Sequence, residues 1–238
     1  MKGLITGATR GIGWAIAQAV LHRTSELTII ARDEGRLDET LARLSKSAPQ
    51  CKVETIAVDL ADLASLRGEL TSWGASGGGV RPLDYVVLNA GTYTEGLLGE
   101  IEIESYLHDL DVNLNSHLVA IQTLLPNLRA GDRRRVVLVG STAAYEPYPA
   151  VPTYGVAKYG LRGLAANLRV ELARDRIGVT FVSPGGTLTD MWEGEEVPVG
   201  RLLEPSDVGA LVDAILGLSE QAVVEELTVL PMEGDMHD

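Results

Sequence analysis

A tyrosine and a lysine four positions apart, Tyr154 and Lys158, form the pair whose residue types and spacing most directly suggest chemistry. Residues four apart share one face of a helix, so the phenol and the ammonium would be neighbours. A free tyrosine has a pKa near ~10, which is too high for acid–base work at neutral pH. A nearby cation favours the phenolate, so we expect Lys158 to lower the pKa of Tyr154. A tyrosine and a lysine with this spacing also occur by chance, so the surrounding motifs must show whether the pair is catalytic.

Two other polar residues could take part in the same chemistry. Ser141 follows a predicted strand over 134–140, and its hydroxyl is a candidate to hydrogen-bond a substrate oxygen. Asn113 lies inside a long predicted helix, where asparagine is a poor helix former. Each has an ordinary alternative, because a serine after a strand is often a turn residue and an asparagine can serve as a packing amide.

A glycine-rich loop with the spacing G-x-x-x-G-x-G follows the first predicted strand and precedes an apolar helix face. Glycines allow a tight turn and let a pyrophosphate approach the backbone, and the helix N-terminus adds free N–H groups. The alternative is a strand–helix turn without a ligand. The residues that we expect to bind a dinucleotide here are Gly7, Thr9, Arg10, Gly11, Ile12 and Gly13.

The end of the second predicted strand distinguishes the two nicotinamide coenzymes. Ala31 stands where an acidic residue would bind the ribose hydroxyls of NAD, and Arg32 follows it. Arg10 could reach the same region, and two guanidinium groups suit the 2′-phosphate of NADP. We therefore predict NADP(H), although Arg32 could instead be a surface ion-pair partner. Asp33 is expected to cap the next helix.

The elements that would position these residues alternate between strand and helix. Several strands are continuous apolar runs, which indicates burial on both faces. We predict an α/β Rossmann fold: a single domain over 1–238 with a doubly wound, parallel, seven-stranded sheet flanked by helices. Strands are expected at 2–6, 26–31, 52–57, 83–88, 134–140, 177–183 and 225–230, and helices at 11–23, 34–47, 62–73, 101–128, 154–175 and 205–219.

Composition excludes several classes of protein. The net charge of −13 disfavours binding to nucleic acid or anionic lipid. One cysteine rules out an intrachain disulfide, suits a reducing cytoplasm and argues against a cysteine-based metal site. The four histidines show no close metal-ligand spacing, and the apolar runs are too short to span a membrane. We expect a cytoplasmic protein without a metal.

With these motifs in order, the chain resembles the short-chain dehydrogenase/reductase family in its compact, non-extended branch. The loop Thr6–Gly13 is similar to the family's TGxxxGxG motif, and Tyr154 with Lys158 to its YxxxK pair. The resemblance implies further coenzyme contacts from Asp59, Leu60, Asn89, Ala90, Gly91, Pro184, Gly185, Thr187 and Thr189, besides Tyr154 and Lys158.

The resemblance also implies roles for the four residues with chemistry. Tyr154 would be the acid/base, and Lys158 would bind the nicotinamide ribose and lower the tyrosine pKa. Ser141 would orient the substrate oxygen, and Asn113 would steady a water chain to solvent. The implied activity is NADP(H)-dependent interconversion of a carbonyl and an alcohol in a small to medium substrate, as in a carbonyl reductase. A homodimer or homotetramer is implied in the same way.

The sequence allows alternative interpretations of the lid segment, the tail, the function and the residues around the pocket. A polar segment over 190–204 is expected to form a substrate lid, with a solvated loop as the alternative. The tail Glu233–Asp238 is expected to be disordered. A coenzyme-binding regulator without catalysis and an extended-branch nucleotide-sugar epimerase are the rival functions. Residues that would line the pocket or pack locally are Tyr93, Thr94, Tyr145, Tyr148, Val151 and Trp192.

Overall fold

The computed structural model describes all of residues 1–238 except 76–77, 193, 195 and 236–238. The described residues form one sheet in the order β3-β2-β1-β4-β5-β6-β7, and every pair of neighbours is parallel. The predicted fold class is therefore confirmed. The strands are β1 (Lys2–Thr6), β2 (Glu26–Ala31), β3 (Lys52–Ala57), β4 (Tyr85–Leu88), β5 (Arg135–Val139), β6 (Gly178–Pro184) and β7 (Glu226–Val229).

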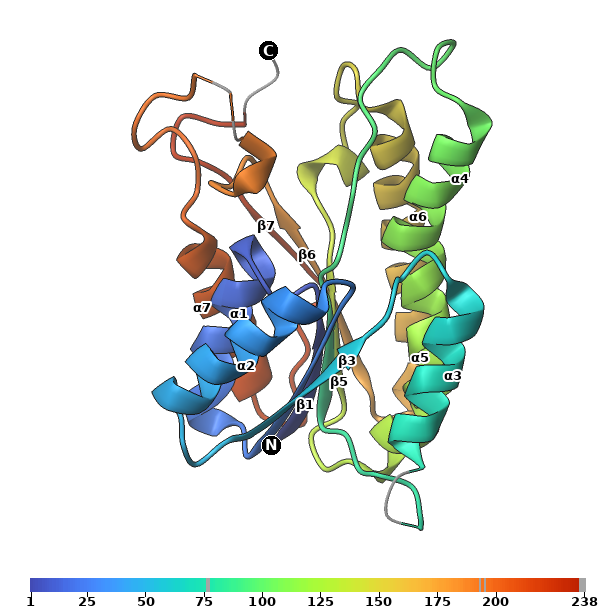
Figure 1. Ribbon diagram of the computed structural model, residues 1–238, viewed down its shortest axis with the longest axis vertical. Helices are drawn as coiled ribbons and strands as arrows, with labels where there is room; N and C mark the ends of the chain where they lie inside the picture. The colour runs from blue at the N-terminus through green and yellow to red at the C-terminus, as the bar shows by residue number, and fades with distance from the viewer. Residues whose placement is uncertain (76–77, 193, 195, 236–238) are drawn as a thin grey trace.

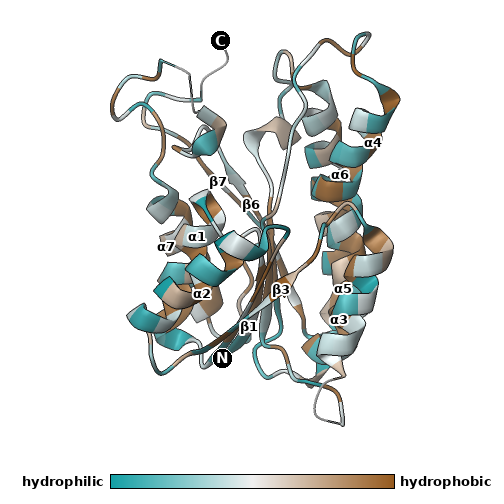
Figure 2. Ribbon diagram, viewed as in Figure 1, coloured by the Kyte–Doolittle hydropathy of each residue, from teal (hydrophilic) through white to brown (hydrophobic). Residues whose placement is uncertain are grey.

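Helices cover both faces of this sheet (Figure 1). One layer contains α1 (Gly11–Val20), α2 (Glu34–Ser47) and α7 (Pro205–Gly217), and the other α3 (Leu63–Gly74), α4 (Ile103–Leu110), α5 (Ser116–Ala130) and α6 (Pro152–Leu172). Each layer has its own hydrophobic cluster against the sheet. In Figure 2 the central strands are brown, as expected for strands that are buried on both faces.

The long helix expected over 101–128 is interrupted. Between α4 and α5 the chain forms a π-helical turn over Asp111–Asn115. Within that turn, the Asn113 side chain donates to the carbonyl of Asp109 at 2.9 Å. An amide side chain thus satisfies a carbonyl that lies next to the irregular turn, and the helix continues in the same direction.

The order of strands reverses between β1 and β4, the neighbours at the centre of the sheet. In such sheets a crevice opens at the carboxyl ends of the strands, where the connections turn to opposite faces. The loops after β1, β4, β5 and β6 all begin at this edge, and they carry the sequence motifs. The topology therefore brings segments that are far apart in sequence to one place.

The C-terminal tail differs from the sequence expectation. The positions 236–238 lie outside the described residues, but Glu233, Gly234 and Asp235 are placed against the rest of the fold. Arg201 donates to the carbonyl oxygens of Gly234 and Asp235 at 2.7 and 3.2 Å. The expectation of disorder is thus wrong for these three residues. In the expected lid, Asp190–Trp192 form a short 3₁₀ turn, and positions 193 and 195 lie outside the described residues.

Gly13, in the first turn of α1, allows the close approach of this helix to the loop after β1. A Cβ atom at this position would lie 2.1 Å from the carbonyl oxygen of Gly7 and 2.5 Å from Nδ2 of Asn89. Gly13→Ala is therefore expected to lower the free energy of unfolding by about 3 kcal/mol, because backbone must shift to accept the methyl group. Urea denaturation measures this change.

Gly68→Ala is the matched control, since a Cβ atom at Gly68 in α3 meets nothing within 4 Å. That variant is expected to be as stable as the wild type or to gain up to about 1 kcal/mol. Equal effects of the two substitutions would contradict the close approach at Gly13.

Candidate active site

The loop between β1 and α1 has the geometry of an anion-binding turn. Gly7 and Gly11 adopt positive φ angles of 69° and 52°, which L side chains rarely accept. The helix that follows has no acidic residue in its first turn, and among the described residues no side chain caps its N-terminus. Free N–H groups and the helix dipole therefore face the crevice. This cradle fits a pyrophosphate.

Asn89 braces the glycine loop. Its Nδ2 donates to the carbonyl oxygens of Thr6 and Gly7 at 3.3 and 3.2 Å. The Thr6 hydroxyl in turn accepts from the backbone N–H groups of Asn89 and Ala90 at 3.1 and 3.2 Å. Hydrogen bonds thus join the loops after β1 and β4. The predicted residues Asn89, Ala90 and Gly91 belong to the second of these loops.

The stretch after β6 faces the glycine loop across the crevice. A Cβ atom on Gly11 would lie 3.1 Å from the Thr189 side chain. The Thr187 hydroxyl donates to the carbonyl of Gly185 at 2.8 Å, and this hydrogen bond stabilises a turn in the stretch after β6. The predicted residues Pro184, Gly185, Thr187 and Thr189 therefore lie in or next to the segment that forms this wall.

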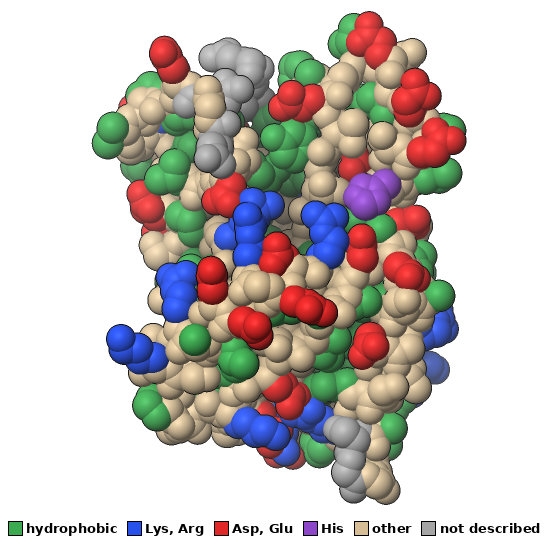
Figure 3. Space-filling model, viewed as in Figure 1, with side chains coloured by type: hydrophobic (Ala, Val, Ile, Leu, Met, Phe, Trp, Pro, Cys, Tyr) green, Lys and Arg blue, Asp and Glu red, His purple; other side chains and the backbone are tan. Residues whose placement is uncertain are grey.

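The two arginines expected to share a phosphate have different partners in the structure. Arg10 Nη1 donates to Asp190 Oδ2 at 2.8 Å, which links the glycine loop to the expected lid. Arg32 Nη1 lies 4.0 Å from Asp59 Oδ2, and its side chain is 75% exposed, so it is available to another anion. Figure 3 shows basic side chains on the face beside the N-terminal ends of α1 and α2. Asp33 caps α2 by accepting from the Arg36 N–H, as predicted.

Lys158 is buried on α6 beside Tyr154. Its Nζ lies 5.2 Å from the centroid of the Tyr154 ring and donates to the Val139 carbonyl oxygen at 3.4 Å. Its 2% exposure removes it from water, and this desolvation lowers the pKa of the ammonium to about 8. A buried ammonium with such a long contact suits a ligand that brings further acceptors.

The Tyr154 phenol does not have the lowered pKa expected from the sequence. Burial is the largest effect and raises its pKa, and the carboxylate of Asp235 raises it further. A hydrogen bond with Ser141 acts in the opposite direction. The Ser141 hydroxyl also accepts from the Ala143 N–H at 3.1 Å, at the start of a short turn over Thr142–Ala144. Ser141 is therefore both a turn residue and a neighbour of the phenol.

Asn113, in the π-helical turn between α4 and α5, binds the loop after β4 through hydrogen bonds. Its Nδ2 donates to the Thr92 carbonyl at 2.7 Å, and its Oδ1 accepts from the Thr92 N–H at 3.3 Å. A Cβ atom at Gly91 would lie 2.8 Å from Asn113 Oδ1 and 3.5 Å from Lys158 Nζ. Gly91, Asn113 and Lys158 therefore converge on one small volume, in which a side chain at 91 has no room.

The structure adds residues that the sequence reasoning missed. His117 is 1% exposed, and burial together with the nearby Lys158 lowers its pKa to about 3. It follows Asn113 by four positions, so helical spacing alone could have placed it on the same face. Asp235 and Arg201 come from the tail and the segment before α7, and no spacing rule connects them to Tyr154.

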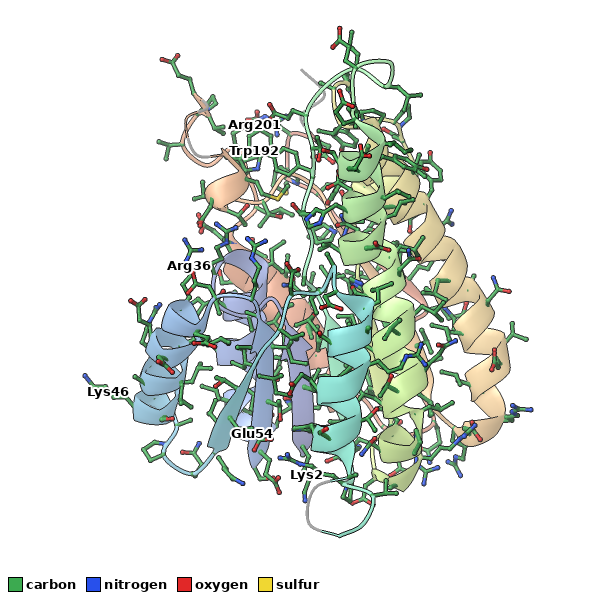
Figure 4. All side chains as sticks on the ribbon, turned by 45° about the vertical axis from the view of Figure 1, so that its right-hand side comes forward. Lys2, Arg36, Lys46, Glu54, Trp192 and Arg201 are labelled. Carbon is green, nitrogen blue, oxygen red and sulfur yellow. The ribbon has the colours of Figure 1, made fainter. Side chains whose placement is uncertain are left out.

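Two of the aromatic residues expected around the pocket have different partners: Tyr145 binds β7, and Tyr148 binds the C-terminal tail. The Tyr145 hydroxyl donates to Glu226 at 2.9 Å, so it points towards β7 and packs locally. The Tyr148 hydroxyl donates to Asp235. Figure 4 shows Trp192 and Arg201 together, above the N-terminal ends of α1 and α2.

Comparisons with known proteins agree with this geometry. A profile of the short chain dehydrogenase family matches residues 3–197. The sepiapterin reductase of Chlorobaculum tepidum is 28% identical over 99% of this chain and 98% of its own. A 3-oxoacyl-acyl-carrier-protein reductase from Brucella melitensis, solved in complex with NAD, is 29% identical with a TM-score of 0.81 over 95% of this chain and 94% of its own.

A third protein shares the fold at lower identity. The structure of an alcohol dehydrogenase from the archaeon Thermococcus sibiricus, complexed with 5-hydroxy-NADP, superimposes with a TM-score of 0.86 at 24% identity. The superposition covers 98% of this chain and 97% of that one.

The buried Lys158 predicts how stability depends on pH. Its pKa is about 8 in the folded protein, against ~10.4 in an unfolded chain. Between pH ~8 and ~10 the unfolded chain therefore binds more protons at this site, so the free energy of unfolding rises with pH by about 2 kcal/mol. Urea titrations of the wild type and of Lys158→Met across this range measure the rise. Parallel pH profiles for the two proteins would contradict the buried ammonium.

Proposed function

The chain belongs to the short-chain dehydrogenase family, and we propose that it is an NADP(H)-dependent oxidoreductase that interconverts a carbonyl and an alcohol in a small to medium organic substrate. The observation that carries the proposal is the convergence of Tyr154, Lys158, Ser141 and Asn113 beside a glycine cradle at one edge of the sheet. Such an arrangement combines proton transfer with an anion site, which is what a nicotinamide reaction needs.

The coenzyme would occupy the crevice between the glycine loop and the stretch 184–189. The free N–H groups of α1 would bind the pyrophosphate, and Lys158 would bind the ribose next to the nicotinamide. Asp59 and Leu60 would hold the adenine, and Asn89–Gly91 would close the adenosine side. The bound coenzyme supplies or accepts a hydride, and the oxidised form brings a positive charge.

Tyr154 would protonate the carbonyl oxygen during reduction and take the proton from the alcohol during oxidation. Ser141, already hydrogen-bonded to the phenol, would orient the same oxygen. Because burial raises the tyrosine pKa, the phenolate needs positive charge from both Lys158 and the oxidised coenzyme. Asn113, which fixes the loop at Thr92, would hold a water that returns protons to solvent.

The preference for NADP(H) rests on Ala31 and Arg32. No acidic side chain stands at position 31, and the exposed Arg32 guanidinium lies at the carboxyl end of β2. Arg10 would join it once released from Asp190. The Brucella relative was solved with NAD, so initial rates with both coenzymes test the preference of this chain.

Several further assignments accompany the enzyme. The segment 190–204 would act as the lid, since Asp190 and Thr189 both lie against the glycine loop. A homodimer or homotetramer would form through the helices over 101–128 and 154–175, that is α4, α5 and α6, where Leu107, Val156 and Val170 are exposed. Among the described residues, none of the helices is long and apolar enough to cross a membrane. We place the enzyme in the cytoplasm.

Tyr154→Phe is expected to lower kcat by at least about 100-fold in both directions, because the variant has no proton to exchange with the substrate oxygen. Coenzyme oxidation with a panel of ketones and aldehydes measures kcat. Binding of NADPH, followed by fluorescence, should remain within about threefold of the wild type. Equal rates for the two proteins would remove Tyr154 from the proposed role.

Arg32→Ala is expected to reduce the ratio of kcat/KM for NADPH to kcat/KM for NADH by about 10- to 100-fold, because a charge-assisted bond to the 2′-phosphate is lost. Initial rates with one carbonyl substrate and both coenzymes give the ratio. Arg43→Ala is a control in α2, where Arg43 stacks 3.8 Å from the Trp14 ring centroid. A wild-type preference for NADH would show that the assignment is wrong.

A further inference from the structure

The C-terminal tail places a carboxylate among the loops that surround the active site. Asp235 Oδ1 accepts from the Gly186 N–H at 2.7 Å, and Oδ2 accepts from the Thr142 hydroxyl at 2.5 Å and from the Tyr148 hydroxyl. These donors come from the loop after β6 and from the segment between β5 and α6. One side chain from the end of the chain thus joins two walls of the crevice.

The backbone of the tail is fixed as well as its side chain. Arg201 is 17% exposed and donates to the Gly234 and Asp235 carbonyl oxygens. A Cβ atom on Gly185 would lie 3.0 Å from both carboxylate oxygens of Asp235, so the carboxylate packs directly on the backbone after β6. The position of this charge is therefore defined by contacts on several sides.

The carboxylate lies close to the reacting groups. Thr142, its hydrogen-bond partner, directly follows Ser141 in the chain. Its charge is one of the causes that raise the pKa of the Tyr154 phenol, so its field reaches the atom that would exchange the proton. A Cβ atom on Gly186 would lie 3.4 Å from Asp235 Oδ1 and 3.4 Å from the Trp192 ring. Asp235 therefore lies between the backbone after β6 and the segment that follows Ser141, close to the Trp192 ring.

Four segments around this wall of the crevice are acidic, while Arg201 and Arg10, which bind the tail and Asp190, lie just outside them. In the sequence, the stretches 92–110, 141–153, 186–200 and 231–238 contain no lysine or arginine, while each contains Asp or Glu. Figure 3 shows acidic side chains on both sides of the upper opening of the face in view. A negatively charged substrate would thus approach several carboxylates, whereas a positively charged one would be attracted.

We propose that Asp235 is a specificity-determining residue that selects carbonyl or alcohol substrates carrying a positively charged nitrogen and disfavours those carrying a carboxylate or phosphate. The inference rests on the proposed function, because it assigns the substrate class of that same site. A half-buried carboxylate attracts a cation more strongly than a fully exposed one does. The same field repels an anion at the same position.

The test uses three methyl ketones of matched chain length that end in a methyl, an ammonium or a carboxylate group. The wild type should show the highest kcat/KM for the ammonium ketone and the lowest for the carboxylate ketone. In Asp235→Asn the ratio of kcat/KM between these two should fall by about 30-fold or more, because the amide is neutral but similar in shape. Asp235→Glu, which keeps the charge, should keep the wild-type order.

Glu233→Gln is the matched control, because it removes the same charge from the same tail at an 80% exposed side chain whose Oε2 lies 3.8 Å from Arg201 Nε. It should leave the ratio within about threefold of the wild type. A ratio that is unchanged in Asp235→Asn, or that falls equally in Glu233→Gln, would overturn the proposal. Melting temperatures of all variants show whether a change reflects loss of folded protein.

A binding measurement separates failure of this inference from failure of the proposed function. Calorimetric titration of the NADP⁺-bound protein with the ammonium and carboxylate ketones reports charge preference without turnover. If no ketone is reduced but the ammonium ketone binds more tightly than the carboxylate ketone, and Asp235→Asn removes that preference, the proposed function fails and the role of Asp235 stands. If ketones are reduced and no charge preference is found in binding or in rates, the role of Asp235 fails alone.

Discussion

The burial of one ammonium group is the constraint on which the active site depends. Lys158 is held away from water with a long contact to the Val139 carbonyl, and its lowered pKa measures the cost of that position. A protein that keeps a cation under these conditions gains little stability from it. The ammonium lies beside functional neighbours: its Nζ is 5.2 Å from the centroid of the Tyr154 ring, and its charge helps to lower the pKa of His117.

Rigid surroundings keep the pair in place. The Thr153 hydroxyl, next to Tyr154 at the start of α6, donates to Asp109 Oδ2 at 2.5 Å, which ties α6 to α4. Asn113 then ties the π-helical turn after α4 to the loop after β4, and Asn89 ties that loop to the glycine turn. A continuous set of side-chain hydrogen bonds therefore connects the proton-transfer pair with the coenzyme cradle. Side chains supported in this way lose little entropy when a substrate binds.

The sequence predicted the sheet and most helices because strands buried on both faces read as apolar runs, as in Tyr85–Leu88, and because glycines mark the first turn. It also predicted the Asp33 cap from residue type alone. It did not predict the π-helical turn, in which Asn113 makes a tertiary contact with Thr92. Nor did it predict the docked tail or the Arg10–Asp190 pair, since both join residues with no fixed spacing. The expected direction of the Tyr154 pKa shift was wrong, because burial of the phenol raises its pKa and burial is a property of the folded chain.

The central claim is that Tyr154 becomes an effective acid and base through the positive charge gathered around its phenol. Ultraviolet difference titration of the wild type against Tyr154→Phe isolates the ionisation of this one tyrosine, and it can be run with and without NADP⁺. The account predicts a pKa above the ordinary value of ~10 in the protein alone and a clear decrease on binding NADP⁺, with a smaller decrease in Lys158→Met. The same titration midpoint with and without the coenzyme would contradict it.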